Sequence, residues 1–263
     1  MNILEEIAGK TRERIAVRRR EVSLEDQKHM AAETAGIRRA DQSFLDALKN
    51  PGIGFICEVK KASPSKGLIA ENFPYLDIAR EYENAGASAI SCLTEPFYFQ
   101  GKNDYLDEIS SAVNIPVLRK DFTVDEYMIY EAKNLGASAI LLICAILSPS
   151  QLQEYRLIAQ KLGMDALVET HSEQEVEMAL NSGAQIIGVN NRDLRTFAVD
   201  VNNSLRLREM VPQDIAFVSE SGIRTAQDIA KLAQNGTDAV LIGETLMRAP
   251  DKKKMLEELK KGY

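Results

Sequence analysis

Short apolar runs recur along the chain, and each is followed by a stretch in which apolar residues have helical spacing. The runs are rich in Ile, Val, Leu and Ala and do not alternate with polar residues, a pattern typical of strands buried on both faces. Eight predicted strands begin near Phe55, Ala89, Pro116, Ala139, Asp165, Ile186, Ile215 and Ala239. The predicted helices that follow them span Tyr75–Ala85, Tyr105–Val113, Glu126–Leu135, Pro149–Leu162, Ser172–Ser182, Ser204–Met210, Thr225–Gln234 and Lys252–Lys260.

A repeated phrase marks the step from helix to strand. Asn84-Ala-Gly-Ala-Ser-Ala-Ile returns at Asn134, and looser versions begin at Lys161, Asn181 and Asn235. In each version a helical pattern stops at or near a glycine, which adopts the left-handed conformation at a helix end at little cost. Strand–helix alternation repeated eight times predicts an α/β fold, a single (β/α)8 TIM barrel. The alternative is an open doubly wound sheet, but residues 61–67 are not the glycine-rich turn that it needs.

The first 50 residues stand apart from this alternation. We expect residues 1–50 to form an N-terminal helical extension packed on the barrel of residues 51–263, one domain overall, with helices at Asn2–Val22 and Ser43–Asn50. The first helix is basic, and two interpretations are open: a solvated face, or a lid whose cations help to hold an anionic substrate. Its cations are Lys10, Arg12, Arg14, Arg18, Arg19 and Arg20.

Composition narrows the class of protein. The 263 residues are 45% hydrophobic with a net charge of −7 and carry no domain-wide basic stripe, which argues against a nucleic-acid partner. The chain shows neither an apolar leader nor an apolar run of about 18 residues, so we expect no secretion and no membrane insertion. Three cysteines in apolar runs indicate reduced thiols and a cytoplasmic protein. Two histidines without a Cys-x-x-Cys pair predict no metal site.

Charged and amide groups gather where the predicted strands end. The first strand runs into Glu58 and Lys60, which are two residues apart and therefore point to the same side. Unpaired buried charges cost several kcal/mol or more, so charges kept at strand ends are candidates for chemistry. Active sites of such barrels lie at the carboxyl ends of the strands. Other strand-end groups are Lys120, Glu169, Asn190, Arg192 and Glu220.

The ends of the last two strands predict a phosphate site. Ser221-Gly222 leads into a helix, and Gly243 precedes a short helical turn at Glu244–Arg248. Backbone N–H groups at helix starts bind phosphate well when glycines allow its close approach. Ser63, on the loop after the first strand, is placed to close this cradle. Glu244 would contribute only its N–H, with its side chain pointing away.

The candidate catalytic groups are lysines and glutamates. A lysine in a dry site near other cations loses its proton more readily and can act as a general acid, whereas nearby carboxylates hold it charged. This set suits proton transfer and dehydration on a sugar phosphate, or Schiff-base chemistry, which needs a neutral lysine. His171, two residues past Glu169, is interpreted as structural or supporting. The candidate catalytic side chains are Lys60, Lys120, Glu58, Glu169 and Glu220.

Six motifs in order along the chain resemble one enzyme family. Glu58-Val-Lys-Lys-Ala-Ser-Pro-Ser-Lys-Gly, Leu118-Arg-Lys-Asp-Phe, Leu167-Val-Glu, Ile187-Gly-Val-Asn-Asn-Arg-Asp-Leu, Ser219-Glu-Ser-Gly-Ile and Leu241-Ile-Gly-Glu are similar to motifs of indole-3-glycerol phosphate synthase. The resemblance spans essentially the whole chain. It matches the stand-alone form, without the isomerase barrel that is fused to some relatives.

The resemblance implies a reaction of tryptophan biosynthesis. The substrate would be 1-(2-carboxyphenylamino)-1-deoxyribulose 5-phosphate, a small anionic sugar phosphate. The products would be indole-3-glycerol phosphate, carbon dioxide and water, and the enzyme would be a carboxy-lyase. No cofactor and no metal are implied, and we expect a monomer or weak homodimer.

The resemblance also implies roles for the candidate residues. Lys120 would protonate the substrate ketone, and Lys60 would bind the carboxylate and donate a proton during dehydration. Glu169 would be the general base, while Glu58 and Asn190 would orient hydroxyl groups of the intermediate. The division between the two lysines stays open. The implied binding residues are Arg192 and Glu220 as polar contacts, Phe122 and Leu194 as apolar walls, and Ser63, Ser221, Gly222, Gly243 and Glu244 around the phosphate.

Three alternatives stay open at this point. The isomerase of the preceding step shares barrel and phosphate site but relies on a cysteine at the end of the first strand, and Cys57 with its neighbours does not fit that pattern. A Schiff-base aldolase would form a covalent adduct that borohydride traps. A barrel without catalytic activity would bind a sugar phosphate for regulation, which the presence of Lys60, Lys120 and Glu169 disfavours.

Overall fold

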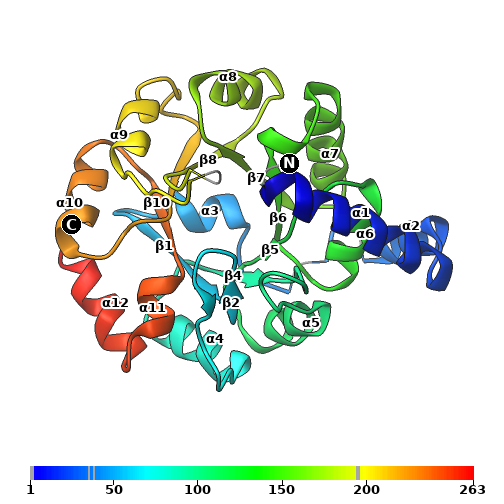
Figure 1. Cartoon of the computed structure of the whole chain (residues 1–263), viewed down its shortest axis with the longest axis horizontal. Helices are drawn as coiled ribbons and strands as arrows, with labels where there is room; N and C mark the ends of the chain where they lie inside the picture. The colour runs from blue at the N-terminus through cyan, green and yellow to red at the C-terminus, as the bar shows by residue number, and fades with distance from the viewer. Residues whose placement is uncertain (1–2, 35, 38, 194–195) are drawn as a thin grey trace.

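The strands close into a parallel barrel. The structure is a computed structural model that describes residues 3–34, 36–37, 39–193 and 196–263. Each barrel strand pairs in parallel with two neighbours, and the ring closes where β1 meets β10 (Figure 1). This confirms the (β/α)8 barrel and rules out the open sheet. The barrel strands are β1 Gly54–Val59, β4 Ala89–Leu93, β5 Val117–Lys120, β6 Ala139–Ile143, β7 Asp165–Thr170, β8 Ile186–Asn190, β9 Ala216–Glu220 and β10 Ala239–Ile242.

Helices surround this ring, and their bounds fall within two residues of the predicted ones. The glycines of the repeated phrase explain this agreement, because Gly86 and Gly136 take φ angles of 81° and 78° directly after their helices. The outer helices are α4 Tyr75–Asn84, α5 Asn103–Ala112, α6 Glu126–Asn134, α7 Pro149–Lys161, α8 Glu173–Asn181, α9 Asn202–Arg208, α10 Ala226–Gln234 and α12 Lys252–Lys260. Two short helices, η1 Cys144–Ile146 and α11 Glu244–Arg248, follow β6 and β10.

The N-terminal helices pack against opposite ends of the barrel. Phe44 and Leu48 of α3 (Phe44–Leu48) belong to the apolar cluster inside the ring, and the N–H of Leu45 donates to Asp165 at the start of β7 at 2.9 Å. Helix α3 therefore closes the amino-terminal end. Leu4 and Ile7 of α1 (Ile3–Glu21) join the same cluster from the carboxyl end, where they lie near Lys120. Figure 1 shows α1 beside β6 and α6. A barrel interior filled by side chains in this way is a packed core.

Two parts of the fold differ from the prediction. A further helix, α2 (Leu24–Glu33), follows α1, where the sequence analysis placed no helix. Ser23 ends one helix and begins the next through a capping box with Asp26, a Ser-x-x-Asp signal that the analysis passed over. A small antiparallel hairpin, β2 (Ala62–Ser63) with β3 (Gly67–Leu68), lies in the loop after β1 and was also not predicted.

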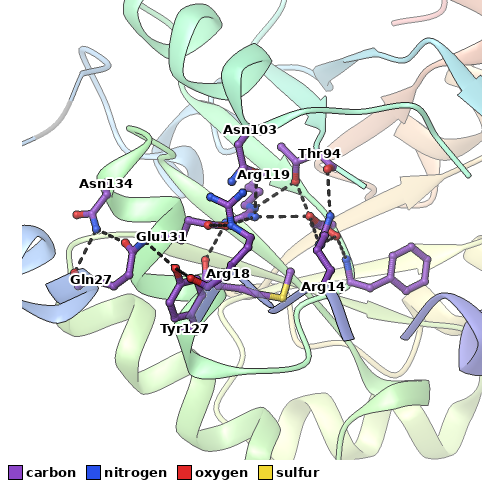
Figure 2. Close-up of polar contacts among 12 residues, drawn as sticks. Arg14, Arg18, Gln27, Thr94, Asn103, Arg119, Tyr127, Glu131 and Asn134 are labelled. Carbon is purple, nitrogen blue, oxygen red and sulfur yellow. Dashed lines mark hydrogen bonds and ion pairs between the residues drawn. The ribbon is translucent and has the colours of Figure 1, made fainter. Parts of the chain in front are cut away.

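Three basic residues of α1 bind carboxylates of the barrel and so fit neither interpretation of that helix, whereas Lys10, Arg12 and Arg20 are exposed. Arg14 Nη2 lies 2.9 Å from both carboxylate oxygens of Asp121, and Arg18 Nε lies 2.6 Å from Glu131 Oε1 (Figure 2). Arg19 Nη2 lies 2.6 Å from Asp125. These three cations neither form a free solvated face nor point at the substrate cavity, because carboxylates after β5 and on α6 bind them.

A buried polar network continues from α1 to the strand that carries Lys120. Arg119 is 1% exposed and points outward from β5, where its Nη2 lies 2.6 Å from Glu131 Oε2 and its Nε lies 3.2 Å from Thr94 Oγ1 (Figure 2). Burial opposes ionisation of Glu131, but Arg119 and Arg18 outweigh it and hold the pKa of this carboxyl below its ordinary value. Because side chains alternate along a strand, Lys120 points the other way, into the barrel mouth.

Candidate active site

One cavity opens at the carboxyl ends of the strands, with a volume of about 380 Å³. It gathers every predicted site residue that the structure describes, whereas Leu194 lies outside the described residues. The predicted residues that line it are Glu58, Lys60, Ser63, Lys120, Phe122, Glu169, Asn190, Arg192, Glu220, Ser221, Gly222, Gly243 and Glu244.

Strand β1 places a carboxylate beside an ammonium group. Lys60 Nζ is bound to Glu58 Oε1, and Ser91 Oγ donates to the other oxygen of Glu58 at 3.4 Å. A Cβ atom on Gly243 would collide with both Glu58 and Lys60, so only glycine leaves room for the pair there. The last strand and the first therefore fit together around this ion pair.

Lys120 lies between two further carboxylates. Its Nζ is 3.2 Å from Glu169 Oε2 and 3.5 Å from Glu220 Oε2. Burial lowers the pKa of this lysine, but Glu169, Glu220 and Glu58 outweigh it and raise the pKa above its ordinary value. The sequence left open whether cations or carboxylates surround this lysine, and the structure places carboxylates beside it. A charged lysine also disfavours the Schiff-base alternative, which needs a neutral one.

The two carboxylates that share Lys120 differ in proton affinity. Burial opposes ionisation of Glu169, but Lys120 and then His171 outweigh it and hold its pKa below the ordinary value. Burial raises the pKa of Glu220 to about 7; Lys120 counteracts this, whereas Glu169 and Glu58 add to it. Environments that push two carboxyl pKa values apart assign them different tasks. Glu169 is thus held ionised, and Glu220 is the carboxyl group that can carry a proton.

Asn190 and Arg192 follow one another at the end of β8. The Asn190 Oδ1 accepts a hydrogen bond from the Arg192 backbone N–H at 3.1 Å, which fixes the amide orientation. The Arg192 guanidinium donates to the carbonyl of Phe197 at 3.4 Å. Both residues line the cavity on the side of β8, beside Glu169 of β7.

Small residues form a cradle across the mouth from Lys120. Ser221 and Gly222 both have left-handed backbone angles, with φ of 70° and 84°. Non-glycine residues held there are strained, and such strain clusters at ligand sites. Thr245 Oγ1 donates to the carbonyl of Ile223 at 2.8 Å and so ties the turn after β9 to the start of α11.

Ser63 faces this cradle from the loop after β1, and Glu244 faces it from the first position of α11. Ser63 lies on the β2–β3 hairpin, and its side chain lines the cavity. The carboxylate of Glu244 lies 3.6 Å from Lys66 and 3.2 Å from Arg248. The side chain of Glu244 is therefore bound by two cations. This leaves its backbone N–H as the group that could contact an anion.

An apolar half of the cavity was largely missed from sequence. Phe122 packs near Phe99, with ring centroids 6.3 Å apart, and Ile3, Leu4 and Ile7 of α1 also line the cavity. The signal was present, since Ile3 and Ile7 are one helical turn apart. The same helix is rich in basic residues, which mask this apolar face in the sequence.

Buried Glu95 shapes the loop that carries Phe99. Its carboxylate accepts the backbone N–H groups of Phe97, Tyr98 and Phe99 at 2.7–3.0 Å. A carboxylate that accepts several backbone bonds fixes a loop strongly. The aromatic wall of the cavity is therefore set by a residue that does not line it.

Two negative findings apply to the described residues. No three His, Cys, Asp or Glu side chains are grouped as a metal site would require. No helix within residues 3–34, 36–37, 39–193 and 196–263 has the length and apolar character of a membrane span.

Solved structures of low sequence identity share the fold. A 3-hexulose-6-phosphate synthase from Salmonella typhimurium matches 80% of this chain and 97% of its own, with a TM-score of 0.66 at 13% identity. A thiamine phosphate pyrophosphorylase from Pyrococcus furiosus matches 81% of this chain and 96% of its own, with a TM-score of 0.60 at 18% identity. These similarities concern the barrel alone.

Sequence comparisons are more specific. The family model described as indole-3-glycerol phosphate synthase matches residues 4–259. Proteins of that name from Ruminiclostridium cellulolyticum and Lacticaseibacillus paracasei are 56% and 55% identical to this chain, over 95% and 98% of both partners. The match runs from the helix that lines the cavity, through every barrel strand, into the last helix, and the chain belongs to the indole-3-glycerol phosphate synthase family.

Proposed function

We propose that this chain closes the indole ring of 1-(2-carboxyphenylamino)-1-deoxyribulose 5-phosphate and releases indole-3-glycerol phosphate, carbon dioxide and water. One observation carries the proposal: the charged Lys120 lies between Glu169, which is ionised, and Glu220. All three residues line the cavity that the family's motifs surround. Ring closure needs an acid, the later dehydration needs a base, and both groups must reach one flat substrate. Strands β5 and β7 supply them.

In the first step Lys120 gives its proton to the substrate ketone oxygen. The ring carbon that bears the carboxylate attacks the ketone carbon, and a C–C bond forms. Carbon dioxide then leaves, and the electron pair of the broken bond returns to the ring. The raised pKa of Lys120 suits this role, because the group enters the step protonated.

In the second step the new hydroxyl group leaves as water. Lys60 donates a proton to the departing oxygen, and Glu169 removes a proton from the carbon beside the nitrogen, so that the indole double bond forms. Glu58 and Asn190 orient the hydroxyl groups. Arg192 and Glu220 bind polar parts of the substrate, while Phe122 holds the aromatic ring; Leu194 is proposed for the same wall from the resemblance alone.

Indole fluorescence tests the activity directly. The chain contains no tryptophan, so product formation would be seen against a dark background. We expect fluorescence to rise with one carbon dioxide released per indole. Tight phosphate-dependent binding without a rise would support the regulatory barrel instead. We also propose a cytoplasmic monomer or weak homodimer that folds as one domain and needs no cofactor.

Replacing Glu169 with glutamine should separate the two steps. The base is needed only for dehydration, so carbon dioxide should appear in the first turnover while indole fluorescence falls by roughly 10²–10⁴ in rate. Stopped-flow fluorescence and trapped carbon dioxide measure the two events. Glu173→Gln, an exposed change on α8, is the control. Equal slowing of carbon dioxide and indole would contradict the assignment of Glu169 as the dehydration base.

We assign the phosphate to Ser63, Ser221, Gly222, Gly243 and the N–H of Glu244, and Gly222→Ala tests this cradle. The residue has a φ of 84°, and a Cβ would lie 2.5 Å from Val199 Cγ1. The added Cβ should displace this turn from the phosphate, and a loss of about 1–2 kcal/mol of binding would raise KM about 5–30-fold.

The competition of inorganic phosphate with substrate should weaken in parallel in Gly222→Ala. Gly9→Ala is the matched control, because nothing lies within 4 Å of its Cβ position. An unchanged KM and phosphate inhibition in Gly222→Ala would remove this residue from the cradle.

A further inference from the structure

The proposed reaction consumes one proton from solvent in each turnover. One proton goes to the ketone oxygen and a second to the departing hydroxyl group, whereas only one is removed from carbon. The difference is one proton, which balances the negative charge of the carboxylate that is lost as carbon dioxide. The proton that Glu169 removes can return to Lys60 through the water that leaves beside both groups, so Lys120 must regain its own proton from solvent. The side chain of Lys120 is 15% exposed and that of Glu169 is 3% exposed. This requirement rests on the proposed roles of Lys120, Lys60 and Glu169.

The side of Glu169 that faces away from Lys120 contacts a histidine. Glu169 Oε2 lies 3.2 Å from Lys120 Nζ, and Glu169 Oε1 lies 3.6 Å from His171 Nε2. The Nε2 atom is buried and has no hydrogen-bond partner among the described residues. One carboxylate therefore bridges the proposed acid and an imidazole that the two reaction steps do not use.

The second nitrogen of this imidazole points toward the outside of the barrel. His171 Nδ1 lies 3.3 Å from Glu175 Oε2, and the same oxygen accepts the backbone N–H of His171 at 2.7 Å. Asn203 Nδ2 donates to the carbonyl of His171 at 3.3 Å. The Glu175 side chain is 23% exposed, against 3% for Glu169. A continuous line of titratable groups thus joins solvent to the buried base.

The charges around His171 favour a proton on the ring. Glu169 from β7, Glu175 from α8 and Glu220 from β9 all face it. Burial lowers the pKa of His171, but the hydrogen bond to Glu175 and the charges of these carboxylates outweigh it and raise the pKa above the ordinary value. Histidine is the side chain whose ordinary pKa suits proton transfer near neutral pH.

We propose that His171 is a proton relay that reloads the Glu169–Lys120 pair from solvent, with Glu175 as its outer partner. The protonated ring gives a proton to Glu169, which passes it to the neutral Lys120. The ring takes a proton up again from water on the Glu175 side. Each cycle moves one proton inward and returns both nitrogens to their starting state, so that no electron and no further reactant is needed.

His171→Asn tests the relay through the difference between first and later turnovers. The first turnover uses protons already held by the lysines, so it should keep its wild-type rate, whereas steady-state turnover should fall at least about 10-fold. The progress curve should show a burst of one product per site, with KM nearly unchanged. Free imidazole should restore the steady-state rate in a concentration-dependent manner. A residue that only supports the fold would slow the first turnover too, without such rescue.

Two further variants test whether the effect depends on the Glu175 contact and on His171 in particular. Glu175→Gln keeps the imidazole but breaks its outer contact, and it should show a weaker burst that imidazole also relieves. His29→Asn changes the other histidine, which is exposed on α2 beside Glu33, and should behave as wild type. Wild-type steady-state rates in both His171→Asn and Glu175→Gln, or losses that imidazole does not restore, would overturn the relay. Inactive wild-type protein would overturn the proposed reaction instead.

Discussion

Replacing Lys120 with alanine should abolish ring closure while leaving phosphate affinity nearly unchanged. Loss of a general acid costs roughly 10²–10⁴ in rate, equivalent to about 2.7–5.4 kcal/mol of barrier. Lys120 is the cation between Glu169 and Glu220, and the cradle of Ser221 and Gly222 lies on other strand ends. The variant should therefore lose kcat and keep its competition with inorganic phosphate.

The matched control is Lys28→Ala, which removes a surface lysine that pairs with Glu126. Indole fluorescence under saturating substrate gives kcat, and inhibition by inorganic phosphate reports the cradle. Thermal unfolding must accompany both, because the variant leaves two buried carboxylates without their shared cation. An equal loss of turnover and phosphate affinity in a folded variant would contradict the assignment of Lys120 as the acid.

Much of the barrel was predictable because its signals are local. Apolar runs without alternation marked strands buried on both faces, and glycines after most of the outer helices, such as Gly86 and Gly136, marked where those helices end. Once the barrel was inferred, topology alone placed Glu58, Lys120, Glu169 and Glu220 at one mouth, because the carboxyl ends of parallel strands meet there. The fold thus converted residues far apart in sequence into neighbours.

The rest depended on contacts between distant segments. Arg14 and Asp121 are 107 positions apart, and no local pattern links them. The direction in which the pKa of Lys120 is shifted was left open for the same reason, since it depends on which charges reach this lysine. His171 was interpreted as supporting, and only the structure shows its ring between Glu169 and Glu175. Distances across the barrel, rather than spacing along the chain, decide such questions.

Replacing Arg119 with methionine should give the largest loss of stability. The guanidinium is 1% exposed, and Glu131, Thr94 and the carbonyl of Met128 all bind it (Figure 2). Removing one partner of a buried ion pair leaves an uncompensated charge and costs about 3–5 kcal/mol. Arg18 also binds Glu131, so we expect the lower end of this range, measured as the free energy of unfolding in urea.

The pH dependence of this loss identifies its cause. In wild type the pKa of Glu131 is held low, so the stability it contributes is present above the ordinary carboxyl pKa and is lost as pH falls through the lowered value. In Arg119→Met the pKa of Glu131 should rise. Protonation of Glu131 then removes the cost of burying its uncompensated charge. The difference in the free energy of unfolding between variant and wild type should therefore become smaller as the pH is lowered from about 7 to about 4.

A double variant and a surface control test whether the loss of stability is caused by charge. Glu131→Gln in the Arg119→Met background should recover part of the lost stability, because it removes the charge left behind. Arg12→Met, an exposed change on α1, should change the free energy of unfolding by less than about 0.5 kcal/mol. A pH-independent loss that Glu131→Gln fails to relieve would mean that Arg119 stabilises the protein by packing rather than by charge. The ion network between α1 and β5 would then not be what holds the N-terminal helix over the cavity.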